Sequence, residues 1–220
     1  FGRAASAWRR GASGRAADRD SGQAKSHSGQ VGGRIRVPVA PLQTVTSAGQ
    51  ALAFMSARGL DKVSAFTIEA TSRLPDVVGR SAAGCYLQSH DRAYVLTYAQ
   101  FRRRQTWFGV PVSRALYRSL VTHESAHAIA ACNFNVAAPS IQAREYIAYV
   151  AMFSTMPAGL RTRALAALPG SGFDELDHVN SIVYLFDPMR FGAESYRHFV
   201  AQPDGAAVLR DVLDGRALAE

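Results

Sequence analysis

The chain has 220 residues, a hydrophobic content of 48% and a formal charge of +8. This length and apolar content allow one domain with a sizeable core, together with a tail. No run of about 18 apolar residues is present, so a membrane-spanning helix is not expected. Most of the excess positive charge lies in residues 1–36, and the rest of the chain is close to neutral. The folded part is therefore not expected to present a basic face for specific nucleic-acid binding.

Residues 1–42 are predicted to be a disordered basic tail and linker. They are rich in Gly, Ser, Ala and Arg and contain few large apolar side chains, so folding would bury too little to offset the ordering entropy. The folded domain is expected to span residues 43–220. Residues 1–30 lack the continuous apolar segment of a signal peptide. We expect a soluble protein whose compartment the sequence does not indicate, with export left open.

The first half of the domain combines a helix with a small sheet. Residues 47–59 are predicted to form a helix that Ser47 caps and Gly59 ends. Residues 62–71 alternate enough for a strand, and residues 82–98 are typical of a hairpin whose turn lies at 89–92.

The second half is predicted to be mainly helical. Ser113 can cap a helix that runs to about Cys132, and Ser140 can cap the next one, which runs to about Met152. Helical periodicity returns over residues 158–168, 173–186 and 204–217, and the connecting segment 186–199 carries a short helix. The order of elements predicts an α+β domain, with a small N-terminal sheet and hairpin followed by a helical half.

The sequence HESAH at 123–127 is a candidate metal motif. His123 and His127 are four residues apart and share one face of a helix, so both imidazoles can bind one Zn²⁺. Glu124 lies roughly 100° further round the helix. From there it can act as general base toward a water on the metal without being a ligand. The structural alternative is a pair of core histidines with hydrogen-bond partners.

A hydrolytic zinc site usually has a third protein ligand. Glu145, on the next predicted helix, is the only acidic residue between Glu124 and Asp174. An antiparallel helical hairpin can bring it opposite the imidazoles, although it can also be a solvated surface carboxylate. The ligand pattern HExxHxxGxxH is excluded, because positions 130 and 133 are Ala and Asn. The alternative third ligands are Asp174, Asp177 and His178.

HESAH followed by Glu145 in REYIAY resembles the gluzincin arrangement of the zincin metallopeptidases. The segments GCY, RALYRSLVTHESAHAIA, REYIAYVAM and DPMRFGAESYRHF are similar to an uncharacterised bacterial family of proposed zinc metallopeptidases. The resemblance covers roughly residues 47–217. It implies a zincin-like fold with one zinc ion on His123, His127 and Glu145, and Glu124 as the base.

The resemblance also implies further roles. Gluzincins tend to take the oxyanion donor from a C-terminal Tyr or His, which favours Tyr196 and His198, with His178 and Tyr149 next. Tyr149 stands where many gluzincins have an Asp that orients a ligand histidine. That role would then fall to Asp174, Asp177 or a backbone carbonyl.

Zincins pair an extended substrate with a sheet edge above the active site. Strand 93–98 or strand 84–88 can supply such an edge, and Gly84 can mark a bulge or a close backbone approach. The basic cluster FRRRQTW at 101–107 can contact an acidic partner, although a solvated loop is its more ordinary role. Cys85 and Cys132 can be two separate buried thiols or a single bridge.

The function favoured by these patterns is a zinc-dependent peptidase that acts on a peptide or protein substrate. One alternative keeps the metal site without peptidase activity, as a binding module or as a hydrolase for non-peptide amides. Another is a non-enzymatic protein that acts through its basic tail. The sequence indicates neither the cleavage specificity nor the oligomeric state.

Overall fold

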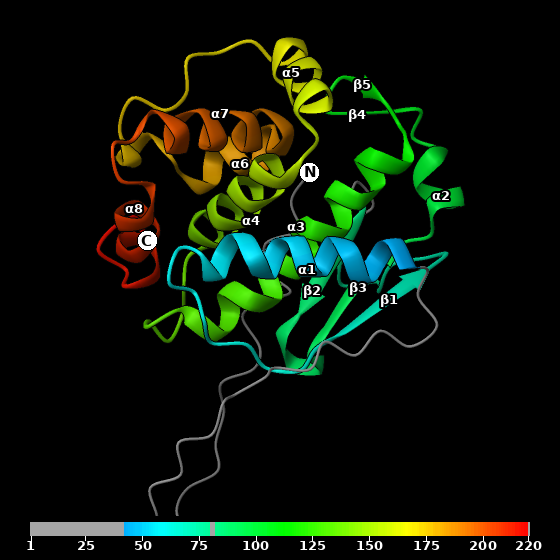
Figure 1. Ribbon diagram of the computed structural model, residues 1–220, viewed down its shortest axis with the longest axis horizontal. Coiled ribbons are helices and arrows are strands. Elements are labelled where there is room, and N and C mark those ends of the chain that lie inside the picture. The colour runs from blue at the N-terminus through cyan, green and yellow to red at the C-terminus, as the bar shows by residue number, and fades with distance from the viewer. Residues whose placement is uncertain (1–41, 80–81, 220) are drawn as a thin grey trace, which may run out of the picture.

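The computed structural model of the protein describes residues 42–79 and 82–219, and the predicted tail lies outside these ranges except for Leu42, which begins a helix. The described part is a mixed α+β structure, as predicted. Figure 1 shows helix α3 between a small sheet on one side and helices α4–α8 on the other. The site described below therefore lies in the middle of the described part, on the central helix.

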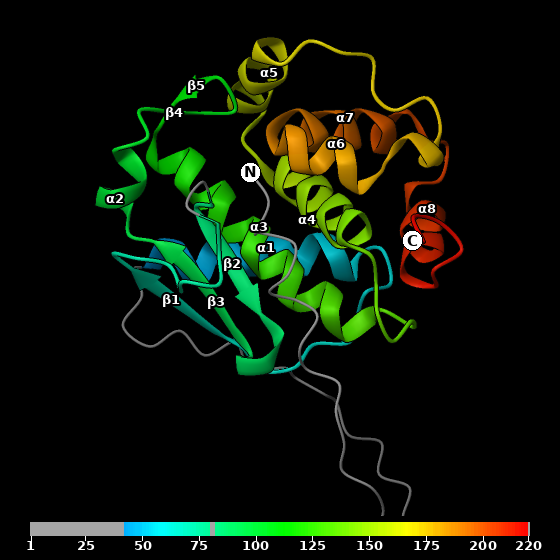
Figure 2. The ribbon, with the colours of Figure 1, turned by 180° about the vertical axis from the view of Figure 1, so that it is seen from behind.

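Helix α1 (Leu42–Ser56) begins earlier than the sequence pattern indicated, so Ser47 lies inside the helix and the predicted cap is wrong. Ser47 is fully buried there. Gly59 follows the helix with φ of 83°, a left-handed conformation that glycine adopts readily. Helix α1 crosses in front of α3 in Figure 1 and behind it in Figure 2. It covers the side of α3 that carries Ala126 and Ala130.

The sheet contains β1 (Thr67–Thr71), β2 (Gly84–Leu87) and β3 (Arg92–Leu96), in the order β1-β3-β2. The predicted hairpin is confirmed, because β2 and β3 are antiparallel, with Gly84 opposite Val95. A short 3-10 turn, η1 (Gln88–His90), joins them. Strand β1 is parallel to β3 and shorter than predicted. Among the described strands β2 is thus an edge strand, and it lies against α3.

A short helix and a two-stranded ribbon lead from the sheet to the central helix. They are α2 (Tyr98–Arg102), β4 (Thr106–Trp107) and β5 (Val110–Pro111). Their aromatic side chains pack on the start of α3, where Phe101 meets Trp107 with 5.4 Å between ring centroids.

The two helices that carry the candidate ligands form a hairpin, as predicted. The Ser113 hydroxyl accepts a hydrogen bond from the Leu116 N–H and caps α3 (Arg114–Asn133). The Ser140 hydroxyl does the same for Ala143 N–H at the start of α4 (Ile141–Thr155). Such caps satisfy N–H groups that the helix leaves unpaired. The two helices pack along their length, which fixes the ligand faces relative to one another.

The remaining elements are α5 (Ala158–Ala167), η2 (Leu176–His178), α6 (Ser181–Phe186), α7 (Pro188–Ala201) and α8 (Gly205–Leu213). The predicted helix over 173–186 is wrong in its first part, which is irregular apart from η2. Conversely, the segment predicted to carry a short helix forms α7, which has 14 residues. Asp187 caps it through Arg190 N–H, and Pro188 occupies its first turn, where proline is favoured.

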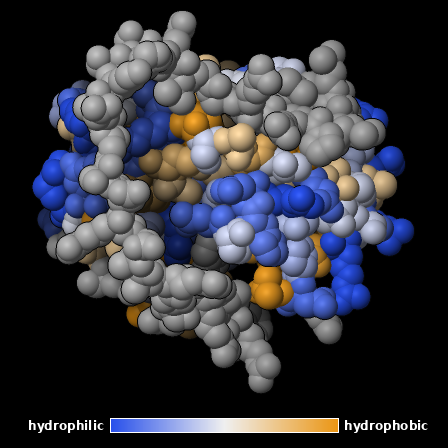
Figure 3. All heavy atoms as spheres, turned by 90° about the horizontal axis from the view of Figure 1, so that it is seen from below, coloured by the Kyte–Doolittle hydropathy of each residue, from blue (hydrophilic) through white to orange (hydrophobic). Residues whose placement is uncertain are grey.

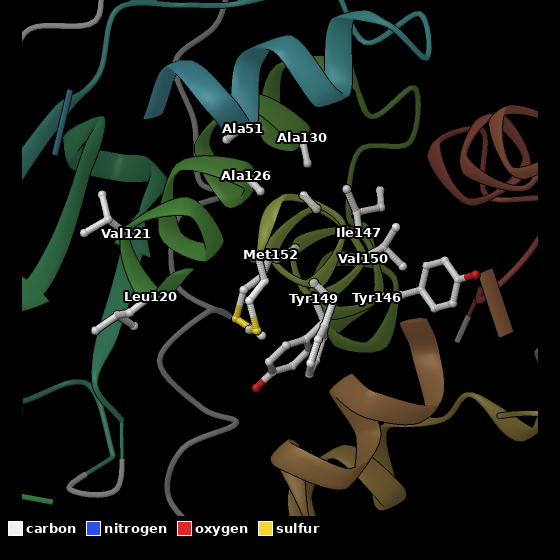
Figure 4. Packing of buried hydrophobic residues seen from close by; sticks show 14 of the residues in the cluster. Ala51, Leu120, Val121, Ala126, Ala130, Tyr146, Ile147, Tyr149, Val150 and Met152 are labelled. Atoms are coloured by element: carbon white, nitrogen blue, oxygen red, sulfur yellow. The ribbon is translucent and has the colours of Figure 1, made fainter. Parts of the chain in front are cut away.

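The core is one continuous cluster built around α3 and α4. Figure 4 shows Ala126 and Ala130 of α3 beneath Ala51 of α1, with Ile147 and Val150 of α4 nearby. Small residues at these positions allow the helices to approach closely. The face of the described part seen in Figure 3 is mainly hydrophilic, with apolar residues in small groups between. No helix among residues 42–79 and 82–219 is long and apolar enough to cross a membrane.

The loop between α3 and α4 is tied to the end of the chain. Asn135 N–H donates to the Leu213 carbonyl at 2.9 Å, and the Asn135 side chain contacts Asp214. The Ser140 hydroxyl that caps α4 also donates to the Leu218 carbonyl, at 2.5 Å. The C-terminal segment therefore holds both ends of the turn that joins the ligand helices.

Candidate metal centre

Three side chains from the helical hairpin converge on one point. His123 and His127 lie one turn apart on α3, and Glu145 faces them from α4, so their ligand atoms all lie within 4.8 Å of one another. These three residues are called the triad below. The structure thus brings together the predicted ligands, and it is the one such group found among the described residues.

The triad distances match a tetrahedral metal. The two Nε2 atoms are 3.1 Å apart, and each lies 3.5 or 3.6 Å from the nearest Glu145 oxygen. Zinc bonds to nitrogen and oxygen are about 2.0–2.1 Å long, so two ligand atoms on a tetrahedral ion lie about 3.3 Å apart. The donor atoms therefore already have the spacing that an ion would require, and imidazole with carboxylate is a donor set that zinc accepts.

The charges of the triad also fit a cation. Burial lowers the pKa of His127 to about 3, with His123 and Arg144 adding to this effect. Burial alone would lower the pKa of His123 too, but Glu145 and Glu124 raise it overall. Conversely, burial alone would raise the pKa of Glu145, but the two histidines lower it. Neutral imidazole and ionised carboxylate are the forms that bind metal, so the shifts of His127 and Glu145 favour binding, whereas His123 has to give up its proton to the ion.

Some buried polar atoms at this site lack an ordinary partner. His123 Nδ1, Glu145 Oε2 and Glu124 Oε2 are buried and make no hydrogen bond of normal geometry. The Ala148 backbone helps to raise the pKa of His123. No hydrogen bond of normal geometry, however, reaches His123 Nδ1. Unpaired buried polar atoms are costly, and an ion bound by Glu145 would give its Oε2 atom a partner.

Glu124 lies beside the triad and against the sheet. Its side chain is buried, with a residue exposure of 4%. Burial raises the pKa of Glu124 to about 8; His123 opposes this rise and Glu145 adds to it. Gly84 of β2 is in such close contact that a Cβ there would lie 2.6 Å from Glu124 Oε1. The close approach anticipated at Gly84 is thus found, and its neighbour is the predicted general base.

Tyr149 lies on the other side of the triad. Its ring centroid is 4.4 Å from that of His123, and burial, with the charges of Glu145 and Glu124, raises its pKa well above the usual value. Gly192 of α7 makes room for this ring, because a Cβ there would lie 2.6 Å from Tyr149 Cδ1. Tyr149 therefore keeps its proton at neutral pH, and its hydroxyl can donate a hydrogen bond.

Tyr184, on the short helix α6, is a site residue that the sequence did not indicate. Its hydroxyl interacts with the Glu145 carboxyl and lowers the pKa of that group. Its ring packs edge-on against Phe191, with 5.5 Å between centroids. Nothing in the segment SIVYLF distinguishes this tyrosine from a core residue, because its role depends on how α6 folds back onto α4.

The alternative ligands lie elsewhere. Asp174 and His178 are exposed and do not belong to the triad's group of ligand atoms. The Asp177 side chain lies outside the described residues. For Asp174 the proposed role of orienting a ligand histidine has no support in the contacts, and the aromatic ring of Tyr149 occupies that side of His123.

Tyr196 and His198 do not come together with the triad in the contacts of the described residues. Tyr196 stacks on Phe153, with 5.4 Å between ring centroids. His198 is buried; its Nδ1 lies 2.8 Å from the Tyr146 hydroxyl, and Gln202 covers its other side. Figure 4 shows Tyr146 leaving α4 in a different direction from Tyr149. Both predicted donors therefore pack on other faces of α4.

Cys85 and Cys132 are free thiols, each partly buried, so no bridge joins them. Cys132 lies 3.2 Å from the Ser64 hydroxyl. Burial raises the pKa of Cys85 to about 12, and the charge of Glu124 adds to this rise. Both thiols are absent from the group of candidate ligands.

Comparison with known proteins gives one match. No curated protein and no solved structure matches the chain. A family model described as a family of unknown function, DUF6639, matches residues 40–220. This range includes α1, the sheet, both ligand helices and everything that follows them. The chain belongs to the family of unknown function DUF6639.

Proposed function

We propose that the protein is a zinc-dependent peptidase of the gluzincin type, with the triad as its metal site. The observation that carries the proposal is the spacing of the donor atoms. The two Nε2 atoms are 3.1 Å apart, Glu145 Oε2 lies 3.5 Å from that of His123, and Glu145 Oε1 lies 3.6 Å from that of His127. Bound there, zinc would acidify a water molecule and polarise the carbonyl of the scissile bond. The roles of general base and of hydrogen-bond donor would belong to protein side chains.

Glu124 is proposed as the general base. It adjoins His123 along α3, is held in place by Gly84, and has an unpaired buried oxygen, Oε2, that can accept a proton. Burial raises the pKa of Glu124 to about 8. A general base is most effective when its pKa lies near the operating pH. A carboxylate in this position takes the proton of the attacking water and passes it to the leaving amine.

Tyr149 and Tyr184 are proposed as hydrogen-bond donors in place of Tyr196 and His198. Both hydroxyls stay protonated at neutral pH, because burial and the nearby carboxylates raise their pKa values. Tyr184 interacts with Glu145 and positions that ligand. Tyr149 lies against His123 and is the closer candidate for the negative oxygen that develops during peptide hydrolysis.

Strand β2 is proposed as the surface that holds the substrate backbone. It pairs with β3 on one side only, and Gly84 at its start touches Glu124. An extended peptide that adds to this edge would make main-chain hydrogen bonds with β2. Its carbonyl would then lie beside the general base. Figure 2 shows β2 at the edge of the sheet nearest α3.

The proposal is tested by separating metal binding from hydrolysis. The purified protein should bind one zinc ion per chain, and His123→Ala, His127→Ala or Glu145→Ala should lose it. Glu124→Gln should keep the ion and lose hydrolysis of a mixed peptide library. If the wild-type protein binds zinc but cleaves neither peptides nor other amides, it is a metal-binding module. If it binds no metal after reconstitution, the proposal is wrong.

A further inference from the structure

A hollow of about 830 Å³ lies at the end of the sheet where β2 begins. Its walls come from the segment 72–79 after β1, from Ala82 and Leu96, and from the residues around the end of α2. Among the described residues that line it are three arginines, Arg73, Arg103 and Arg104, and one acidic residue, Asp76. The hollow, called the arginine hollow below, thus has an excess of positive charge. Two of its arginines, Arg103 and Arg104, belong to the basic cluster at 101–107.

The arginine hollow adjoins the candidate active site. Ala82 is two residues before Gly84, which touches Glu124, and two residues of extended chain span about 7 Å. Leu96, which also lines the hollow, donates its N–H to the Ala83 carbonyl and follows the residue paired with Gly84. An extended peptide on the edge of β2 that continues past Gly84 therefore approaches Ala82, which lines the arginine hollow.

The arginines differ in what they can offer a ligand. Arg104 is half-buried and donates to the Ala82 carbonyl, so it fixes the wall next to β2. Arg73 pairs with Asp76 at 2.5 Å, but both side chains are more than 80% exposed, and such surface pairs contribute little. Arg103 is exposed and forms no ion pair with a described residue. Arg103 and Arg73 are thus accessible to an incoming anion.

The direction of the peptide decides which part of it reaches the arginines. Antiparallel pairs are commoner than parallel ones and slightly more stable per residue. A peptide antiparallel to β2 places its carboxyl-terminal half toward Ala82 and its amino-terminal half toward Leu87. The group that enters the arginine hollow then lies about two to four residues after the scissile bond.

We propose that the arginine hollow binds a carboxylate of the substrate, on the carboxyl-terminal side of the bond next to Glu124. The inference rests on the proposed function and specifies its substrate as a peptide with an acidic group there. The carboxylate can come from an Asp or Glu side chain or from the free C-terminus. Guanidinium groups bind either one with charge-assisted, often bidentate hydrogen bonds.

The test measures binding without turnover. Full-length Glu124→Gln protein, loaded with zinc, is titrated into fluorescein-labelled, C-terminally amidated hexapeptide mixtures that fix Glu, Gln or Lys at each position in turn. Mixtures with Glu in the carboxyl-terminal half should bind about 3- to 10-fold more tightly than those with Lys, and the difference should shrink with added salt. Gln mixtures with a free C-terminal carboxylate form the second arm.

Matched variants locate the effect. Arg103→Glu should abolish the preference for Glu, whereas Arg102→Glu, which makes the same charge change on an exposed residue outside the arginine hollow, should leave it intact. Asp76→Asn removes the competing acid and should strengthen the preference. If only peptides with a free C-terminus bind more tightly, the ligand is the terminal carboxylate. If only peptides with a fixed Glu bind more tightly, the ligand is a side-chain carboxylate.

Two failures can be told apart. If the mixtures bind equally, or none binds, or Arg102→Glu acts like Arg103→Glu, the inference is wrong, whatever the wild-type enzyme hydrolyses. If the preference follows Arg103 but the zinc-loaded wild-type protein cleaves no peptide, the arginine hollow binds carboxylates and the proposed peptidase function is wrong.

Discussion

Gly84 and Glu124 are 40 residues apart in the sequence and in direct contact in the structure, since a Cβ at position 84 would lie 2.6 Å from Glu124 Oε1. The contact joins the edge strand of the sheet to the helix that carries the triad. It is the point at which a peptide on β2 would meet the proposed general base. Glycine is required here by space, because its neighbour is a buried carboxylate with little room to move.

Gly84→Ala should therefore move the Glu124 carboxylate and reduce peptide hydrolysis by at least about 10-fold, while zinc binding stays close to stoichiometric. Small displacements of a catalytic group are enough for such losses. Gly49→Ala is the matched control, because no atom lies within 4 Å of a Cβ built at that position. Equal activity of the two variants would contradict the proposed role of the Gly84 contact.

Zinc should stabilise the fold through the triad. A ligand present at about 1,000 times its Kd stabilises the native state by about 4 kcal/mol, which raises Tm on the order of 10 °C for a domain of this size. Calorimetry with and without a chelator measures the shift. His127→Ala should show no chelator effect. A shift of equal size in His127→Ala would place the metal elsewhere.

Tyr184→Phe should weaken zinc binding or activity by about 10- to 100-fold, the usual effect of removing a group that positions a metal ligand. The reason is that its hydroxyl interacts with Glu145 and lowers the pKa of that ligand. Tyr149→Phe should instead lower kcat with zinc affinity retained. Tyr196→Phe serves as the control, because Tyr196 stacks on Phe153. Loss of kcat in Tyr196→Phe alone would restore the donor favoured by the sequence.

Cys85 should alkylate slowly in the native protein. Burial, with the charge of Glu124, raises its pKa to about 12 from an ordinary value of 9.0, so at pH 8 the reactive thiolate is rarer by about 1,000-fold than in the unfolded chain. Mass spectrometry of iodoacetamide-treated Cys132→Ala protein, native and in denaturant, isolates the Cys85 rate. Equal rates in the two states would show that Cys85 is not protected.

The same shift has a defined sign for stability. The folded state holds the Cys85 proton more tightly than the unfolded state does. Its contribution to the free energy of unfolding is therefore complete below about pH 9 and is lost as pH rises toward 12. Denaturant titrations between pH 8 and 11 should show a decline that is smaller in Cys85→Ala.

The triad was predictable because its signals are local. The spacing of His123 and His127 follows from helix geometry, and Ser113 and Ser140 fixed the starts of both helices. With a short loop between them, the helices pack antiparallel, which leaves Glu145 few other positions. At Gly84 the sequence indicated a bulge or a close backbone approach, but it did not indicate that the neighbour is Glu124.

Other features depended on tertiary packing that the sequence pattern does not contain. Tyr184 reaches Glu145 because α6 folds back onto α4, whereas His198 turns toward Tyr146 and away from the triad. The start of α1 was misplaced because Ser47, a good capping residue, is buried within the helix instead. In each case the packing of a distant segment overrode a local preference.

The tie between the chain end and the turn before α4 extends the site beyond its own residues. Ser140 caps the helix of Glu145 and simultaneously holds the Leu218 carbonyl. Any event at residues 213–218, such as proteolysis or the docking of another molecule, would thus act on the anchoring of a candidate metal ligand about 70 residues upstream. Contacts far from the triad can in this way influence its geometry.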